Sequence, residues 1–135
     1  MANHIDVAFC GDLIARVGVR LLDISKRGER AQNWEGMFQH FMEANTWAVD
    51  QIKLGLAQKY PDIHWSNAEF EIDKQHGDQF EGDYWLCDPI DGAINFLQGL
   101  PCWSTSLCLV HNGQPQCSLI YDPCQKELFH TVAGE

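Results

Sequence analysis

The chain has 135 residues, enough for one domain with a modest hydrophobic core, and 45% of them are hydrophobic, as in folded globular proteins. Nineteen acidic residues against nine basic ones give a net charge of −10, which argues against nucleic-acid binding because a phosphate backbone requires a basic surface. The longest apolar stretch, near residues 106–110, is too short to span a bilayer, and no basic, signal-like N-terminus precedes it. We therefore expect a soluble, cytoplasmic protein that does not contact a membrane.

The first predicted element is a helix from about Asn3 to Gly28. Asparagine is a favourable N-cap residue, and Gly28 follows Lys26 and Arg27, which suit the negative end of a helix dipole. Between these ends, apolar residues recur at helical spacing and define one stripe: Ile5, Phe9, Leu13, Val17, Leu21 and Ile24.

A second helix is predicted over Thr46–Lys59, with its end at Tyr60-Pro61 because proline disfavours helical geometry in the preceding residue. Its buried face is expected to carry Ala48, Val49, Ile52 and Leu56. The segment Trp34–Phe41 before it is ambiguous, since its apolar spacing is also compatible with a helix.

From Ile63 onward the pattern is typical of strands. Short strands are expected around Trp65, Phe70 and Ile72, with a turn at residues 76–78. Further elements are a buried strand over 83–88, a short helix over 93–97 and a meander of strands over 103–110, 116–121 and 127–132. The sequence therefore predicts a single α+β domain, residues 1–135, with two N-terminal helices packed on a mostly antiparallel sheet.

The most informative motif is Asp88-Pro-Ile-Asp-Gly-Ala-Ile-Asn-Phe96. It places two carboxylates three positions apart on a predicted turn, directly before a short helix. Carboxylate oxygens are ligands that Mg²⁺ prefers, and helix N-termini favour phosphate groups. The alternative interpretation is an ordinary turn that closes a buried strand.

Together with Trp85 and Gly99-Leu100-Pro101, this motif resembles the signature of the inositol monophosphatase family, which comprises Mg²⁺-dependent, Li⁺-sensitive phosphomonoesterases. The resemblance implies the first half of a layered αβαβα fold, in which the counterpart of residues 34–41 is an extended arm. It also implies that Asp88, Asp91 and the Ile90 carbonyl bind metal, and that the amides of Gly92 and Ala93 bind phosphate.

Three positions depart from the family pattern. Asn45 replaces a metal-site aspartate, and we expect it to cap the second helix as aspartate does. Ala68 occupies the position of a metal-ligand glutamate, which Glu69 replaces only if the register slips by one residue. Ala93 replaces the threonine that helps to orient the attacking water in the family.

The family's W-D-x-x-A motif, which carries a further metal-ligand aspartate, does not occur in this sequence. The expectation is thus a truncated, catalytically inactive or impaired relative with weak Mg²⁺ binding and a binding or regulatory role. The alternative is an active phosphatase of a small phosphate ester whose site another subunit completes. A homo-oligomer is expected in either case, because a half-fold exposes an apolar face.

The remaining reactive side chains point to structural roles. The six cysteines form no C-x-x-C pair, and we expect free thiols rather than a zinc site or a disulfide framework. Ser104, Thr105 and Ser106 lack a nucleophile-elbow motif and are expected to be polar strand positions.

Overall fold

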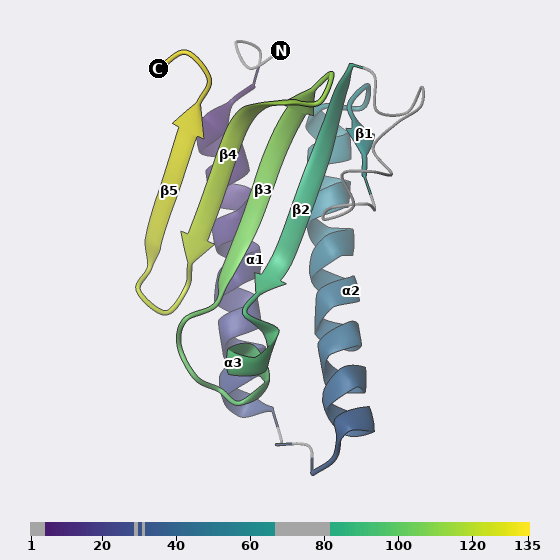
Figure 1. Ribbon diagram of the computed structural model, residues 1–135, viewed down its shortest axis with the longest axis vertical. Coiled ribbons are helices and arrows are strands. Elements are labelled where there is room, and N and C mark those ends of the chain that lie inside the picture. Colours follow the sequence, from purple (N-terminus) through teal and green to yellow (C-terminus); the bar gives the residue numbers. More distant parts are fainter. Residues whose placement is uncertain (1–4, 29, 31, 67–81) are drawn as a thin grey trace.

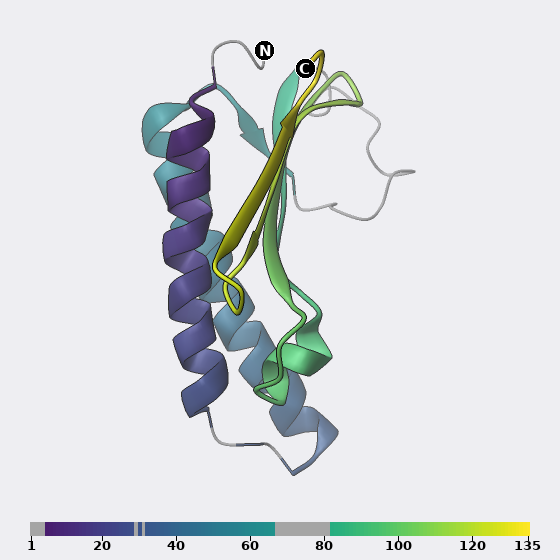
Figure 2. The same ribbon diagram turned by 90° about the vertical axis from the view of Figure 1, so that its left-hand side faces the viewer.

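The computed structural model describes residues 5–28, 30, 32–66 and 82–135. Two long helices lie side by side on one face of a five-stranded sheet, which confirms the predicted α+β class (Figures 1 and 2). The elements follow in the order α1 (Val7–Arg27), α2 (Trp34–Lys59), β1 (His64–Trp65), β2 (Asp83–Asp91), α3 (Ala93–Leu97), β3 (Ser104–His111), β4 (Gln114–Asp122) and β5 (Glu127–Val132).

Helix α1 begins later than the sequence suggested. Its N-cap is Asp6, whose carboxylate accepts a hydrogen bond of 3.0 Å from the backbone N–H of Phe9, so the cap is not Asn3, which lies outside the described residues. The helix ends at Gly28, as predicted. Its apolar stripe is confirmed, because Leu13, Val17 and Leu21 are buried while Phe9 and Ile24 pack at the margin of the core.

Helix α2 begins at Trp34, and the predicted start at Thr46 was wrong. The side chain of Asn33 accepts a hydrogen bond of 2.8 Å from the backbone N–H of Gly36, so this asparagine is the N-cap. The segment 34–41 is therefore helical and not an extended arm. Asn45 lies in the interior of the helix and does not cap it, which corrects the second expectation about this region.

The sheet has the strand order β1-β2-β3-β4-β5. Strand β1 runs parallel to β2 and the other pairs are antiparallel, so the predicted meander is confirmed. Of the short strands expected before β2, Trp65 belongs to β1, whereas Phe70, Ile72 and the turn at 76–78 lie outside the described residues.

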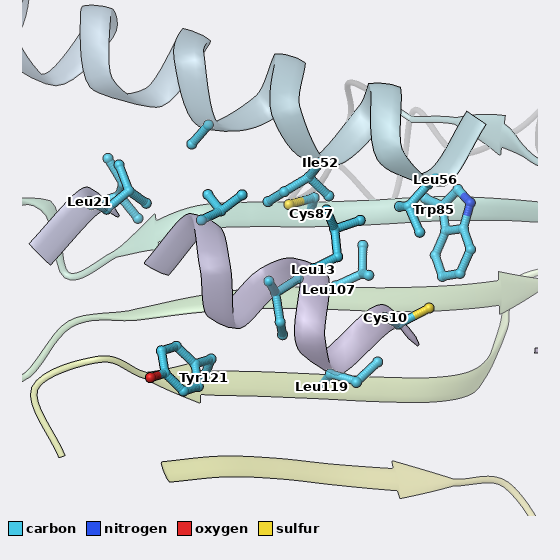
Figure 3. Close-up of a cluster of buried hydrophobic side chains, with 14 of the residues drawn as sticks. Cys10, Leu13, Leu21, Ile52, Leu56, Trp85, Cys87, Leu107, Leu119 and Tyr121 are labelled. Atoms are coloured by element: carbon cyan, nitrogen blue, oxygen red, sulfur yellow. The ribbon is translucent and has the colours of Figure 1, made fainter. Parts of the chain in front are cut away.

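The core lies between the helix pair and one face of the sheet (Figure 3). Side chains of both helices pack there against alternate residues of the central strands, including Trp85, Cys87, Leu107, Leu119 and Tyr121. Removal of this apolar surface from water is the main stabilising term of the fold. No helix among the described residues is long and apolar enough to cross a membrane.

The opposite face of the sheet is not covered by any described helix (Figure 2). Leu86 and Cys108, which are paired across β2 and β3, are half-buried on this face. Ile120 and Phe129, paired across β4 and β5, are 45% and 56% exposed. An apolar surface of this kind is typical of a contact site.

Candidate metal centre

The two aspartates of the motif lie on the same face of the sheet because β2 carries a β-bulge. Asp88 is paired with Ser106 and Asp91 with Ser104, so β2 contains one more residue than β3 over the same length. In a regular strand, residues three positions apart point to opposite faces. Ile90 is buried in the core on the helix side, and Asp88 lines a hollow with Leu86 and Cys108 on the uncovered face. Because the additional residue shifts the alternation by one, Asp91 follows Asp88 onto that face. The expected turn is therefore the bulged end of a strand.

The charges of the two aspartates interact. Burial raises the pKa of Asp88 above its ordinary value, and the neighbouring charge of Asp91 raises it further, while the backbone N–H of Ile90 donates to the Asp88 carboxylate and opposes both effects. Asp88 is half-buried and Asp91 is exposed. Two carboxylates that repel each other at the edge of solvent form an arrangement that a bound cation stabilises.

Strand β3 holds the bulge in place. The fully buried hydroxyl of Thr105 donates a hydrogen bond of 2.8 Å to the carbonyl oxygen of Pro89, and the hydroxyl of Ser106 donates one of 3.3 Å to that of Asp88. Their prediction as polar strand positions is confirmed, but no sequence pattern indicates these contacts. The partners are 16 and 18 residues apart in the chain, and no local motif links them.

The turn between β2 and α3 requires glycine. Gly92 has a φ of 98°, in the left-handed region, and a Cβ atom at this position would lie 2.8 Å from the carbonyl oxygen of Cys102 and 3.0 Å from the Cβ of Trp103. The ring of Trp103 packs edge-on against that of Phe96, with their centroids 5.1 Å apart. Helix α3 begins at Ala93, as predicted, and N–H groups in the first turn of a helix have no partner within it.

Not all predicted site residues are brought together. Ala68 and Glu69 lie outside the described residues, and Asn45 belongs to α2. Ile90 is only 3% exposed, and its apolar side chain packs in the core and supplies no metal ligand.

The residues present fit one kind of cation site. Within the described ranges, no group of three or more His, Cys, Asp or Glu side chains is arranged to hold a metal ion. Mg²⁺, however, commonly keeps several waters and uses one or two carboxylates together with substrate phosphate. Asp88 and Asp91 match that donor set.

The structure resembles known proteins over nearly the whole chain. An inositol monophosphatase from Thermotoga maritima superposes with a TM-score of 0.71 and 26% identity, covering 96% of this chain and 48% of that one. Inositol monophosphatase II from Staphylococcus aureus gives a TM-score of 0.75 at 22% identity, with 96% and 46% covered. The fold is therefore that of the first part of these enzymes.

The sequence comparisons agree. The chain is 35% identical over 92 residues to a fructose-1,6-bisphosphatase/inositol-1-monophosphatase of Thermotoga maritima, which covers 68% of this chain and 32% of that protein. It is 43% identical over 51 residues to Nus factor SuhB of Pasteurella multocida, covering 38% of this chain and 19% of that protein. The chain thus spans half or less of the length of the relatives it matches. The model of the inositol monophosphatase family matches residues 11–135, and the chain belongs to that family.

Proposed function

We propose that this chain is a non-catalytic member of its family that retains a two-carboxylate site for Mg²⁺. The observation that carries the proposal is the bulge that brings Asp88 and Asp91 to one face, where their charges interact. The positions at which the family resemblance expects the remaining catalytic groups hold Asn45 and Ala93, which supply neither a carboxylate nor a hydroxyl.

The chemistry explains why these replacements matter. In phosphomonoester hydrolysis, bound Mg²⁺ screens the phosphate charge and lowers the pKa of a coordinated water. This chain's own groups provide two carboxylates to hold the cation, and the backbone N–H groups of Gly92 and Ala93 to donate hydrogen bonds to a phosphate oxygen. Asn45 adds no negative charge to the site, and Ala93 has no hydroxyl to orient a water molecule. Binding of a cation and of a small phosphate ester is therefore expected without turnover.

The second candidate is an active phosphatase of inositol monophosphate or a related small phosphate ester, with its site completed by another subunit. The uncovered face of the sheet favours this candidate. Asp88 lines a hollow on that face together with the half-buried Leu86 and the exposed Ile120, so a second copy packed there would bring its own side chains next to this carboxylate. A homo-oligomer is required by this candidate and is compatible with the first.

Phosphate release from inositol 1-phosphate in the presence of Mg²⁺ distinguishes the two candidates. The wild type is compared with Asp88→Asn/Asp91→Asn, which removes both carboxylates while keeping similar side-chain volumes. The first candidate predicts equal background rates for the two proteins. Turnover by the wild type that is inhibited by Li⁺ and lost in the double variant overturns it and supports the second candidate.

Restoring the family residues tests the second candidate from the opposite direction. If another subunit completes the site, Asn45→Asp together with Ala68→Glu restores carboxylates at the two positions where the family resemblance implies them, and the rate is expected to rise. Sedimentation shows whether the restored variant is an oligomer. If it is an oligomer and its rate of phosphate release does not rise, this result counts against completion of the site by another subunit.

A further inference from the structure

A second surface, on the far side of the molecule from the carboxylates, has the chemistry of a binding groove. It lies between α1 and α2, and its lining includes the exposed residues Arg16, Arg20 and Leu54. Its volume is about 350 Å³, within the range of ligand and peptide sites. Its floor is apolar, with Leu13 and Val17 from α1 and Trp47 and Leu54 from α2.

The rim of this groove is cationic and rich in donors. Arg16 and Arg20 line its α1 side, and Gln51 and Gln58 line its α2 side. Among the described residues, the lining contains no carboxylate, although the chain as a whole has 19 acidic and nine basic residues. The groove is therefore a positively charged site on a strongly acidic protein, which favours an acidic occupant.

The two arginines are available for such an occupant. No ion pair of Arg16 is found in the described part of the chain. The guanidinium of Arg20 is 3.9 Å from the carboxylate of Asp23, at the limit of an ion pair, whereas that carboxylate lies 2.6 Å from the guanidinium of Arg27. Asp23 is thus engaged mainly by Arg27, and Arg20 stays 65% exposed.

The floor indicates what kind of acidic occupant fits. Leu54 is 58% exposed, and at the same end of the groove Gly55 lets α2 approach the side chain of Leu13 closely. A free inorganic anion would leave this apolar floor in contact with water. A peptide that combines carboxylates with an apolar anchor would cover it and reach the arginines at the same time.

The spacing of the arginines indicates the conformation of the peptide. Arg16 and Arg20 are four residues apart on α1 and therefore lie on one face, one helical turn from each other. Carboxylates at positions i and i+4 of a third helix have the same spacing. We propose that the groove between α1 and α2 binds an acidic amphipathic helix of a partner protein, with Arg16 and Arg20 pairing its carboxylates and the floor receiving its apolar side chains.

Fluorescence anisotropy with a labelled synthetic peptide tests this proposal. The probe is a helical peptide of about 18 residues with glutamates at i and i+4 beside a leucine stripe, long enough to form a helix. Arg16→Gln/Arg20→Gln is compared with the control Lys53→Gln/Lys126→Gln, which removes the same charge at exposed positions outside the groove. We expect saturable binding by the wild type and the control, and binding weaker by about tenfold or more in the arginine variant.

Two further peptides separate this mode from general attraction to anions. Replacing both glutamates of the peptide by glutamine, or its leucines by alanine, is expected to abolish saturable binding. The proposal is overturned if the wild type shows no saturable binding of the original peptide, or if the arginine variant binds that peptide as tightly as the wild type does. It is also overturned if the wild type binds the alanine peptide as tightly as the original peptide. Leu54→Gln provides a second variant at an exposed floor position, where a folding defect is not expected.

Discussion

The hydroxyl of Thr105 donates a hydrogen bond of 2.8 Å to the carbonyl oxygen of Pro89, and this contact anchors the bulge that aligns Asp88 with Asp91. Thr105 and Pro89 are both fully buried, so this contact belongs to the core and not to the solvent-exposed site. The geometry of the carboxylates therefore depends on a side chain that does not face the cation.

Thr105→Val is expected to destabilise the protein by about 1–3 kcal/mol, because it leaves the buried carbonyl of Pro89 without its donor while the volume is kept. Mg²⁺ affinity should also fall if the bulge positions the carboxylates. The control is Ser106→Ala, whose hydrogen bond is longer and only partly buried, with an expected cost below about 1 kcal/mol. Urea unfolding measures the stabilities of the two variants. Equal stabilities of Thr105→Val and Ser106→Ala would contradict this role of Thr105.

Gly92→Ala is expected to cost about 2 kcal/mol or more, because the new Cβ would meet the carbonyl oxygen of Cys102 at 2.8 Å in a left-handed backbone conformation. Gly113→Ala is the matched control. Gly113 also has a positive φ, of 81°, but open space surrounds it, so a cost of about 1 kcal/mol is expected. Thermal unfolding of both variants checks the difference. A smaller loss of stability in Gly92→Ala than in Gly113→Ala would show that the packing around the turn is loose enough to accept a Cβ atom.

Asp88→Asn is expected to stabilise the metal-free protein at neutral pH. Burial and the charge of Asp91 raise the pKa of Asp88 above 3.8, so the folded state holds this proton more tightly than the unfolded chain does. The contribution of Asp88 to the free energy of unfolding is fully present below pH 3.8, and it is lost as the pH rises through the folded-state pKa. Because Asp88 is only half-buried, we expect a gain of less than about 1 kcal/mol at neutral pH.

Urea unfolding of this variant and the wild type between about pH 4 and 8, with EDTA present, measures the pH dependence. The difference should shrink toward the acidic end of the range. A variant that is less stable than the wild type at neutral pH would mean that the charge of Asp88 is favourably paired without a metal.

The six thiols are expected to differ widely in reactivity. Cys10 is fully buried, and burial, followed by its buried neighbour Cys117, raises its pKa to about 12, so it carries almost no thiolate at neutral pH. Cys102 is exposed in the loop before β3 and should react first with a disulfide reagent. The measurement is the time course of thiol labelling in the native protein with peptide mapping. Labelling of Cys10 as fast as that of Cys102 would contradict the described core.

The helices show how far the sequence predicts this fold. The apolar stripe of α1 and the meander follow from local spacing and turn residues, and both are confirmed. The predicted start of α2 lies too late in the chain, because the extended arm implied by the family resemblance conflicts with the true N-cap, Asn33. The local signal for the helix start is an asparagine directly before an apolar segment of helical spacing.

The candidate metal centre shows what the sequence does not predict. The identities of Asp88 and Asp91 are visible in the motif, but their common face depends on a bulge whose donor, Thr105, belongs to another strand. Period-two alternation alone would place the two carboxylates on opposite faces. Pairing across strands, which a single sequence does not contain, decides the geometry.

Calorimetric titration of Mg²⁺ into the wild type and into Asp88→Asn/Asp91→Asn, alongside the phosphate-release assay, measures cation binding and catalysis in the same two proteins. We expect saturable binding by the wild type, loss of that binding in the double variant, and no release of phosphate from inositol 1-phosphate by either protein. A wild type that does not bind Mg²⁺ would contradict the cation site, and one that binds it and turns over substrate would contradict the lack of catalysis.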